Sequence, residues 1–216
     1  MALVVTGATG AATSGAATSL TYSHTTNSGD DLTVVGGACG AITGITFNGD
    51  AFTEAVARDV DGFEAGLWYR VNPDIVTGNV VISQTPTWEI SSGAVNFSGA
   101  DTADPIGNTA SASDVNTVDV TLTTSGNIVL DVIRNADQNT TLTAGANQTD
   151  RWNQATGAGT GRNKGAGSTE AAGGTITMSC TNSTSDNPRI AAAEINAVAG
   201  AGVAGVIPTL LYMGVG

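Results

Sequence analysis

Two turn dipeptides divide the stretch from Ile42 to Val71 into three short segments, each with the composition of a β-strand. The dipeptides are Asn48-Gly49 and Asp61-Gly62. Both tolerate the positive φ angles that a two-residue hairpin turn requires. Because strands joined by such short turns run in opposite directions, this stretch predicts an antiparallel β protein. It indicates no particular chemistry.

Apolar and polar side chains alternate in many segments between Leu20 and Ile195. Clear examples are Leu20–His24, Phe63–Val71, Val118–Leu122 and Ile176–Cys180. Only 12% of the residues are charged, whereas 41% are hydrophobic, a composition that suits strands and turns better than helices. A period of two, with turn residues between the segments, is typical of a sandwich or jelly roll. We therefore predict an all-β fold: one antiparallel, jelly-roll-like β-sandwich over residues 20–196, with extended N- and C-terminal arms.

Two stretches of low complexity are predicted to lie outside the strands. Residues 1–19 consist largely of Ala, Thr, Gly and Ser. Within them, Val4–Gly10 resembles the glycine turn of a dinucleotide-binding fold, but Thr13 stands where a third glycine belongs. Residues 1–19 are therefore predicted to be an N-terminal arm. Residues 153–174 are rich in glycine but lack the Gly-Lys-Ser/Thr of a phosphate loop, and they are predicted to form an exposed loop.

The segment 197–216 carries no charged residue. Its length is close to that of a transmembrane helix, but its glycines, the central Pro208 and the lack of a basic flank disfavour that alternative. An exposed apolar tail associates with other molecules unless a partner buries it. We therefore expect residues 197–216 to be an assembly arm. Its apolar contacts would come from Val206, Ile207, Leu210, Leu211, Tyr212 and Met213.

The net charge of −12 restricts the partners of this chain. Nucleic acid binding needs clustered Lys and Arg, whereas the chain has one lysine, Lys164, and scattered arginines. We therefore exclude nucleic acid, and the same charge disfavours anionic membranes. The start of the chain, Met1–Gly7, has no basic region and no long apolar core. We accordingly expect no Sec signal peptide and synthesis in the cytoplasm.

The sequence offers few groups that suit catalysis. His24 is the single histidine, and its place on an alternating strand suits packing better than proton transfer. A glycoside hydrolase would need two carboxylates that face each other across a sugar, but no tight acidic motif is present. The glutamates considered for that reaction are Glu54, Glu64, Glu89, Glu170 and Glu194. We expect a protein that is not an enzyme and that uses no cofactor.

Metal binding and a disulfide are the two remaining chemical alternatives. Paired loop aspartates supply the hard oxygen ligands that calcium prefers, although Asp in a turn usually bonds its own backbone. The pairs are Asp59 with Asp61 and Asp101 with Asp104, and we predict no metal at either. Cys39 and Cys180 both lie in strand-like runs and are predicted to be small buried side chains. A disulfide between them remains open, since sequence does not give the required geometry.

The three tryptophans are the candidates for contact with a glycan or a partner. Sugar binding without hydrolysis needs exposed aromatic side chains. Trp68 lies on the strand face that also carries Glu64 and Arg70, opposite the more apolar face. Trp88 and Trp152 lie near predicted strand ends. The alternative for all three is the edge of the core or a contact between subunits.

Several motifs follow one another in a characteristic order. They are Leu20-Thr-Tyr-Ser-His-Thr, Leu32-Thr-Val-Val-Gly, Ile42-Thr-Gly-Ile-Thr-Phe-Asn-Gly, Leu67-Trp-Tyr-Arg-Val, Gly93-Ala-Val-Asn-Phe-Ser-Gly-Ala-Asp and Ala191-Ala-Ala-Glu-Ile. This order resembles a β-sandwich module of large bacterial surface proteins and phage structural proteins. The resemblance covers residues 18–196, and it brings no catalytic residues. It implies a jelly-roll-like fold used for display, adhesion or assembly.

These expectations favour a structural protein of a virion. We predict a capsid decoration or head-fibre protein of a tailed phage, forming a trimer or larger homo-oligomer and docking on another capsid or surface protein. The alternative is a carbohydrate-binding or adhesive domain on a bacterial cell surface, with a glycan as the partner. A glycosidase is the third hypothesis.

Overall fold

A computed structural model describes residues 2–113, 117–125, 127–157, 163–171, 173–184 and 186–199. This part of the chain contains sixteen strands and no helix, and every strand pairing in it is antiparallel. The predicted all-β, antiparallel class is therefore confirmed. The segment 200–216, with Val206, Ile207, Leu210, Leu211, Tyr212 and Met213 of the expected assembly arm, lies outside the described residues.

The strands fall into two sets of eight along the chain. The first set is β1 (Val4–Ala12), β2 (Ala17–Thr25), β3 (Leu32–Phe47), β4 (Asp50–Ala51), β5 (Thr53–Val60), β6 (Phe63–Val71), β7 (Thr77–Trp88) and β8 (Ser91–Ser98). The second set is β9 (Ile106–Ser113), β10 (Thr117–Thr124), β11 (Ile128–Asn135), β12 (Leu142–Ala144), β13 (Thr149–Ala155), β14 (Lys164–Ala171), β15 (Gly174–Asn182) and β16 (Arg189–Ile195). We call residues 4–98 the first half and residues 106–195 the second half.

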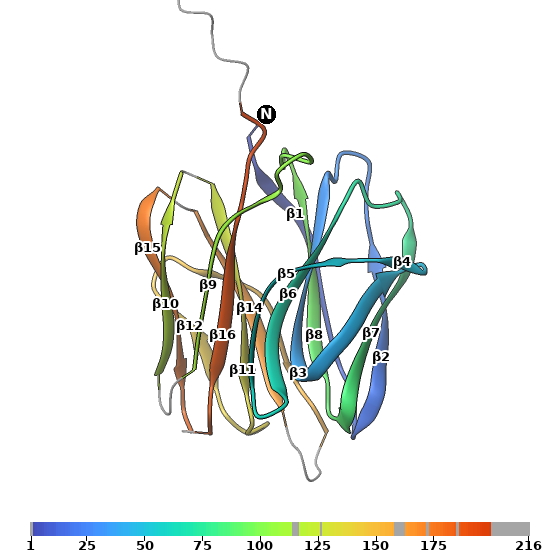
Figure 1. The fold of residues 1–216 in the computed structure, drawn as a ribbon, viewed down its shortest axis with the longest axis vertical. Coiled ribbons are helices and arrows are strands. Elements are labelled where there is room, and N and C mark those ends of the chain that lie inside the picture. Colours follow the sequence, from blue (N-terminus) through green and yellow to red (C-terminus); the bar gives the residue numbers. More distant parts are fainter. Residues whose placement is uncertain are drawn as a thin grey trace, which may run out of the picture.

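The two halves stack as four layers of sheet. The first inner layer has the order β1-β8-β3-β6-β5, and the second inner layer has the order β9-β16-β11-β14-β13. The first outer layer contains β2, β7, β4 and the end of β3, which crosses from the inner layer. The second outer layer is β10-β15-β12. Figure 1 shows these layers in succession, from β2 and β7 on one side to β10 and β15 on the other.

Each gap between neighbouring layers holds its own hydrophobic core. The central core joins the two inner layers, for example Leu67 and Phe97 of the first half with Val132 and Ile195 of the second. A second core lies between the layers of the first half, and a third between those of the second. The sequence predicted a single sandwich over residues 20–196. The structure instead has two sandwiches that share the central core.

The second half repeats the strand order of the first half. Adding eight to each strand number of the first inner layer gives the order of the second. The outer pair β2–β7 likewise corresponds to β10–β15. In each half, the strands 1, 8, 3 and 6 form one sheet and the strands 2 and 7 belong to the other, which is a jelly-roll arrangement.

The pairing register is also repeated. Leu32 of β3 lies between Val71 and Phe97, and Ile128 of β11 lies between Ala171 and Ile195 in the same way. The irregularities match too. A bulge between Glu54 and Val56 corresponds to the bulge between Asp150 and Trp152, and a bulge between Val5 and Gly7 of β1 corresponds to the one opposite Glu194 in β9. Such agreement indicates that one eight-stranded unit is present twice.

The predicted hairpins are confirmed by the backbone angles. Asn48 and Gly49 have φ values of 52° and 93°, and Asp61 and Gly62 have φ values of 55° and 76°. Positive φ at both central residues is the requirement of the hairpin turn whose twist matches the strands. These turns join β3 to β4 and β5 to β6.

Two predictions that were based on low-complexity segments of the sequence are wrong. Residues 4–12, predicted as part of an arm, form β1 along the edge of the first inner layer, paired with β8. Residues 164–171, predicted as part of an exposed loop, form the buried strand β14 between β11 and β13. Gly10 of β1 and Gly165 and Gly167 of β14 lie against a large side chain, so their small size serves packing. The glycine content of these segments therefore reflects close approach between strands.

That large side chain is Trp152 of β13, which is 5% exposed and belongs to the central core. Its indole lies against glycine backbones of both inner layers. A Cβ atom added at Gly93 or Gly167 would overlap the indole ring, and one at Gly36 or Gly165 would lie 3.0 Å from it. Only glycine at these positions leaves room for the ring.

We predict that Gly93→Ala destabilises the protein by about 1–3 kcal/mol or more, because the new methyl group must displace Trp152. Urea denaturation would measure the change. Gly44→Ala is the matched control, because a Cβ atom there meets nothing within 4 Å. That control is expected to be neutral or slightly stabilising. Equal stability of the two variants would contradict the packing argument.

Candidate functional site

The three candidate tryptophans have different surroundings. Trp152 is buried in the central core and presents no face to a glycan, so its predicted contact role is wrong. Trp88 packs on Phe63 with 5.0 Å between the ring centroids. Trp68 is half-buried against the core of the first half. Packing within the chain therefore occupies all three side chains to different degrees.

Phe63 also lies beneath two buried arginines. The guanidinium carbon of Arg134 is 4.4 Å from the ring centroid of Phe63, and that of Arg189 is 5.7 Å away. Burial lowers the pKa of Arg134 to about 10, and the neighbouring Arg189 contributes to this shift. Arg189 also donates a hydrogen bond to the backbone oxygen of Val60 at 3.0 Å. This cluster joins the two halves through cation–π contacts.

His24 belongs to a buried polar network. Its Nε2 donates to Asn96 Oδ1 at 2.8 Å, and its Nδ1 accepts from the Thr9 hydroxyl at 3.1 Å. The Thr33 hydroxyl donates to the same Asn96 oxygen. Burial lowers the pKa of His24 below its usual value. Because both ring nitrogens are engaged by neutral groups, the geometry assigns His24 a structural role.

Three of the candidate glutamates are buried. Glu194 accepts hydrogen bonds from the backbone of Ser125 and the side chain of Asn127. Burial alone would raise the pKa of Glu194, but these hydrogen bonds outweigh it and lower the pKa. Glu64 accepts a hydrogen bond from the backbone of Ile42 at 2.8 Å. The third, Glu89, is also buried, so none of the three lies open to a substrate.

Two carboxyl groups have strongly raised pKa values. Burial raises the pKa of Glu64 to about 7, and repulsion from Glu54 and Asp59 adds to the effect. Burial likewise raises the pKa of Asp131 to about 7, although Ser168 donates to its carboxylate from both the backbone and the hydroxyl. Both groups therefore titrate near neutral pH, within the fold and away from any pocket described below.

The loop aspartates and the cysteines have local roles. Asp101 accepts backbone hydrogen bonds from Ala103 and Asp104, which is a turn bonding its own backbone. Over the described ranges, no group of three or more His, Cys, Asp or Glu side chains is placed to hold a metal ion. Cys39 and Cys180 are free, buried and part of different cores, as small apolar side chains would be.

Among the described residues, large hydrophobic side chains remain exposed at two places: beside the paired chain ends and in the connection between β6 and β7, which Figure 1 shows at the same end of the molecule. In the described part of the chain these are Val4, Ile75, Val76 and Val198. We call this end the apolar pole. Val4 is 49% exposed and Val198 is 45% exposed.

No helix in the described ranges is long and apolar enough to cross a membrane.

Both ends of the folded body lie at the apolar pole. Gly99 lies against the backbone of Ala2, and its carbonyl accepts a hydrogen bond from the backbone of Val198 at 2.9 Å. Ala197 forms a β-bridge with Ala100. Figure 1 shows the N-terminus beside the chain that leaves β16. The uncharged segment 197–216 therefore starts at the pole where hydrophobic side chains are already exposed.

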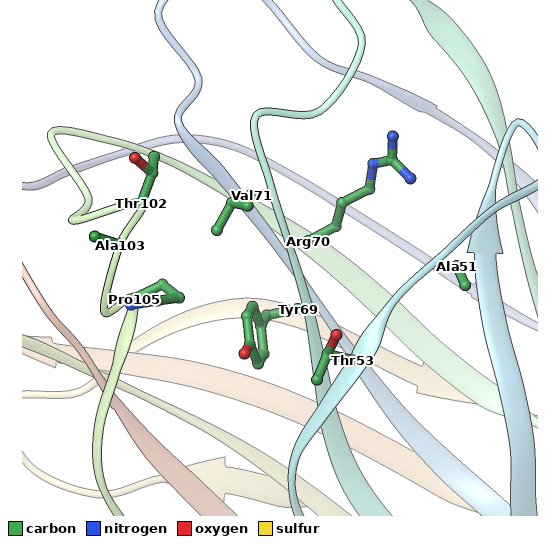
Figure 2. A pocket seen from close by; sticks show the side chains of 8 residues that line it. All are labelled: Ala51, Thr53, Tyr69, Arg70, Val71, Thr102, Ala103 and Pro105. Atoms are coloured by element: carbon green, nitrogen blue, oxygen red, sulfur yellow. The ribbon is translucent and has the colours of Figure 1, made fainter.

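A pocket of about 370 Å³ lies next to the linker between the two halves. It is lined by Ala51, Thr53, Tyr69, Arg70, Val71, Thr102, Ala103 and Pro105. Figure 2 shows the ring of Tyr69 between Pro105 on one side and Thr53 on the other, with Arg70 pointing away from it. Arg70 forms an ion pair with Asp50 at 2.7 Å. This pocket was not predicted from the sequence.

The linker wall of the pocket is fixed by Asn196, the residue after β16. The backbone of Asn196 donates to Pro105 and accepts from Asp101. Its side chain donates to the backbone oxygen of Asp104 at 2.9 Å. The pocket is therefore preformed, because hydrogen bonds between the linker and the second half hold the linker wall in place.

Comparison of the chain with protein-family models, with curated proteins and with solved structures found no match.

We predict that Glu64→Gln stabilises the protein above pH 7 and has little effect near pH 5. The folded protein holds a proton on Glu64 that the unfolded chain loses near pH 4.5. Stability of the wild type is therefore lost as the pH rises from about 4.5 to about 7. Glutamine keeps an acceptor for Ile42 and carries no charge to bury, so the expected gain at pH 8 is on the order of 1–3 kcal/mol.

Thermal and urea unfolding of both proteins from pH 5 to pH 8 would measure this difference. Asp119→Asn, which removes one exposed carboxylate from β10, is the control. It should show no comparable gain over the same range. A constant difference between wild type and Glu64→Gln at every pH would contradict the assignment.

Proposed function

We propose that this chain is a non-enzymatic structural protein of a virion, of the capsid decoration or head-fibre type. It docks on its assembly through the apolar pole and the uncharged segment 197–216, and it displays the layered body outward. The partners are further copies of the chain and another capsid protein.

The observation that carries this proposal is the position of the exposed hydrophobic side chains. Val4 and Val198 are exposed where the two chain ends meet, and Ile75 and Val76 are exposed in the β6–β7 connection at the same end of the molecule. Hydrophobic side chains exposed at one end of the molecule, and continued there by an uncharged segment, favour a surface that a partner covers. Scattered hydrophobic side chains would carry no such meaning.

The outer layers have the opposite character. Their exposed positions carry hydroxyl side chains, with cross-strand hydrogen bonds between Thr25 and Thr77 at 2.8 Å and between Thr121 and Thr177 at 2.9 Å. Such faces remain in water without a partner. The molecule thus has one end suited to docking and broad faces suited to display.

The alternative is a carbohydrate-binding or adhesive surface domain. Of its three candidate tryptophans, Trp152 is buried and Trp88 packs on Phe63, which leaves the half-buried Trp68. The pocket at Tyr69 is the observation that favours sugar binding, and it is compatible with a displayed virion protein.

We predict that deletion of residues 200–216 converts the assembled protein into a monomer that keeps its fold. The deletion starts after Ala199, so that the Ala100–Ala197 bridge and the Val198 hydrogen bond remain. Light scattering coupled to size exclusion would give the particle mass, and the thermal unfolding curve would report the fold.

Ile75→Asp tests the pole itself without shortening the chain, and Thr121→Asp on the second outer layer is its matched control. We expect Ile75→Asp to weaken assembly and Thr121→Asp to leave it unchanged. A monomeric full-length chain, or an unchanged particle mass after the deletion, would overturn the docking proposal.

A further inference from the structure

The register repeat allows the pocket to be compared with the same place in the other half. Thr53 pairs with Tyr69 in the first half, and Thr149 pairs with Thr169 in the second. Both pairs lie close to the shared bulge of their strands. The repeated framework therefore tolerates a threonine where the first half has an aromatic ring. The strand arrangement that the two halves share therefore does not require an aromatic side chain at position 69.

The residues at the shared bulge differ in size between the two halves. In the second half the bulged residue is Arg151, whose Nε donates to the Thr169 hydroxyl at 2.7 Å. In the first half the bulged residue is Ala55, which has only a methyl group. The long side chain that covers Thr169 thus has no counterpart over Tyr69. The linker residues Thr102, Ala103 and Pro105 add a wall to the pocket.

The lining of the pocket suits a neutral, polyhydroxylated ligand. The Tyr69 ring provides an apolar face, extended by Pro105, and Thr53 and Thr102 provide hydroxyl groups that both donate and accept. Pyranose sugars have the same combination, an apolar face of C–H groups with hydroxyls around its edge. The volume of about 370 Å³ is within the range of small-molecule sites.

Charge disfavours an acidic ligand. Arg70 is the one charged residue of the lining, and Asp50 neutralises it at 2.7 Å. The net charge of −12 adds a long-range repulsion of anions. The pocket therefore has no net attraction for a carboxylate or a phosphate.

We propose that this pocket binds one neutral pyranose residue of a glycan, with the apolar face of the sugar on Tyr69 and its hydroxyls bonded to Thr53 and Thr102. All eight lining residues belong to one chain, so the site is complete in a single copy. Sugar binding is therefore independent of the assembly role, and the two can fail separately.

Saturation-transfer difference NMR of the full chain tests this proposal. The probes are the methyl glycosides of glucose, galactose, mannose and N-acetylglucosamine, each titrated to about 10 mM, which covers the affinity expected from few contacts. At least one of them should bind saturably. Tyr69→Ala should weaken that binding about tenfold or more, since the stacking face is lost.

Matched variants separate binding from folding. Thr53→Val should weaken binding severalfold, whereas Thr149→Val, at the equivalent place in the second half, should not. Ala55→Arg, which copies the second half, should cover Tyr69 and abolish binding. Thermal unfolding of each variant shows whether the fold is kept. If Tyr69→Ala does not fold, the binding measured for Thr53→Val tests the proposal in its place.

Three outcomes would overturn the proposal. They are the absence of binding by all four neutral glycosides, binding that Thr53→Val and Ala55→Arg leave unchanged, and tighter binding of methyl glucuronide than of methyl glucoside. The last outcome would show that the site selects a carboxylate. Loss of binding in Thr149→Val would equally contradict the assigned position.

Discussion

The contact between Trp152 and the glycines around it sets the spacing of the two inner layers. The indole is the largest side chain of the central core, and it lies against Gly93 and Gly36 of the first half and Gly167 and Gly165 of its own half. Close packing leaves no space for a methyl group at these places. The unusual glycine content of the chain is therefore partly explained by one side chain that needs flat backbone on both sides.

The two halves agree in strand order, register and bulges, so their differences are informative. Trp152 has Val56 as its counterpart, which means that one half supplies the indole and both halves supply the glycines. Tyr69 corresponds to Thr169, and Ala55 corresponds to Arg151. The first difference fills the central core with an indole, and the second places an aromatic ring in the pocket.

Local signals in the sequence were sufficient for the fold class. The Asn48-Gly49 and Asp61-Gly62 turns and the alternation in segments such as Val118–Leu122 depend on neighbouring residues alone. The strands β1 and β14 were missed because Gly10, Gly165 and Gly167 are explained by Trp152, which lies in a different strand from each of them. The pocket was missed for the same reason: Tyr69 and Pro105 meet only when the linker folds back.

The first and last strands of each half pair with each other, β1 with β8 and β9 with β16. Neither inner layer is therefore complete until nearly all of its half has been synthesised, and such long-range pairing makes folding slow. On the ribosome the first half can close before the second is made. During that interval the first inner layer has no facing layer. Leu67 and Phe97 therefore lack their packing partners in the central core, because those residues have not yet been translated.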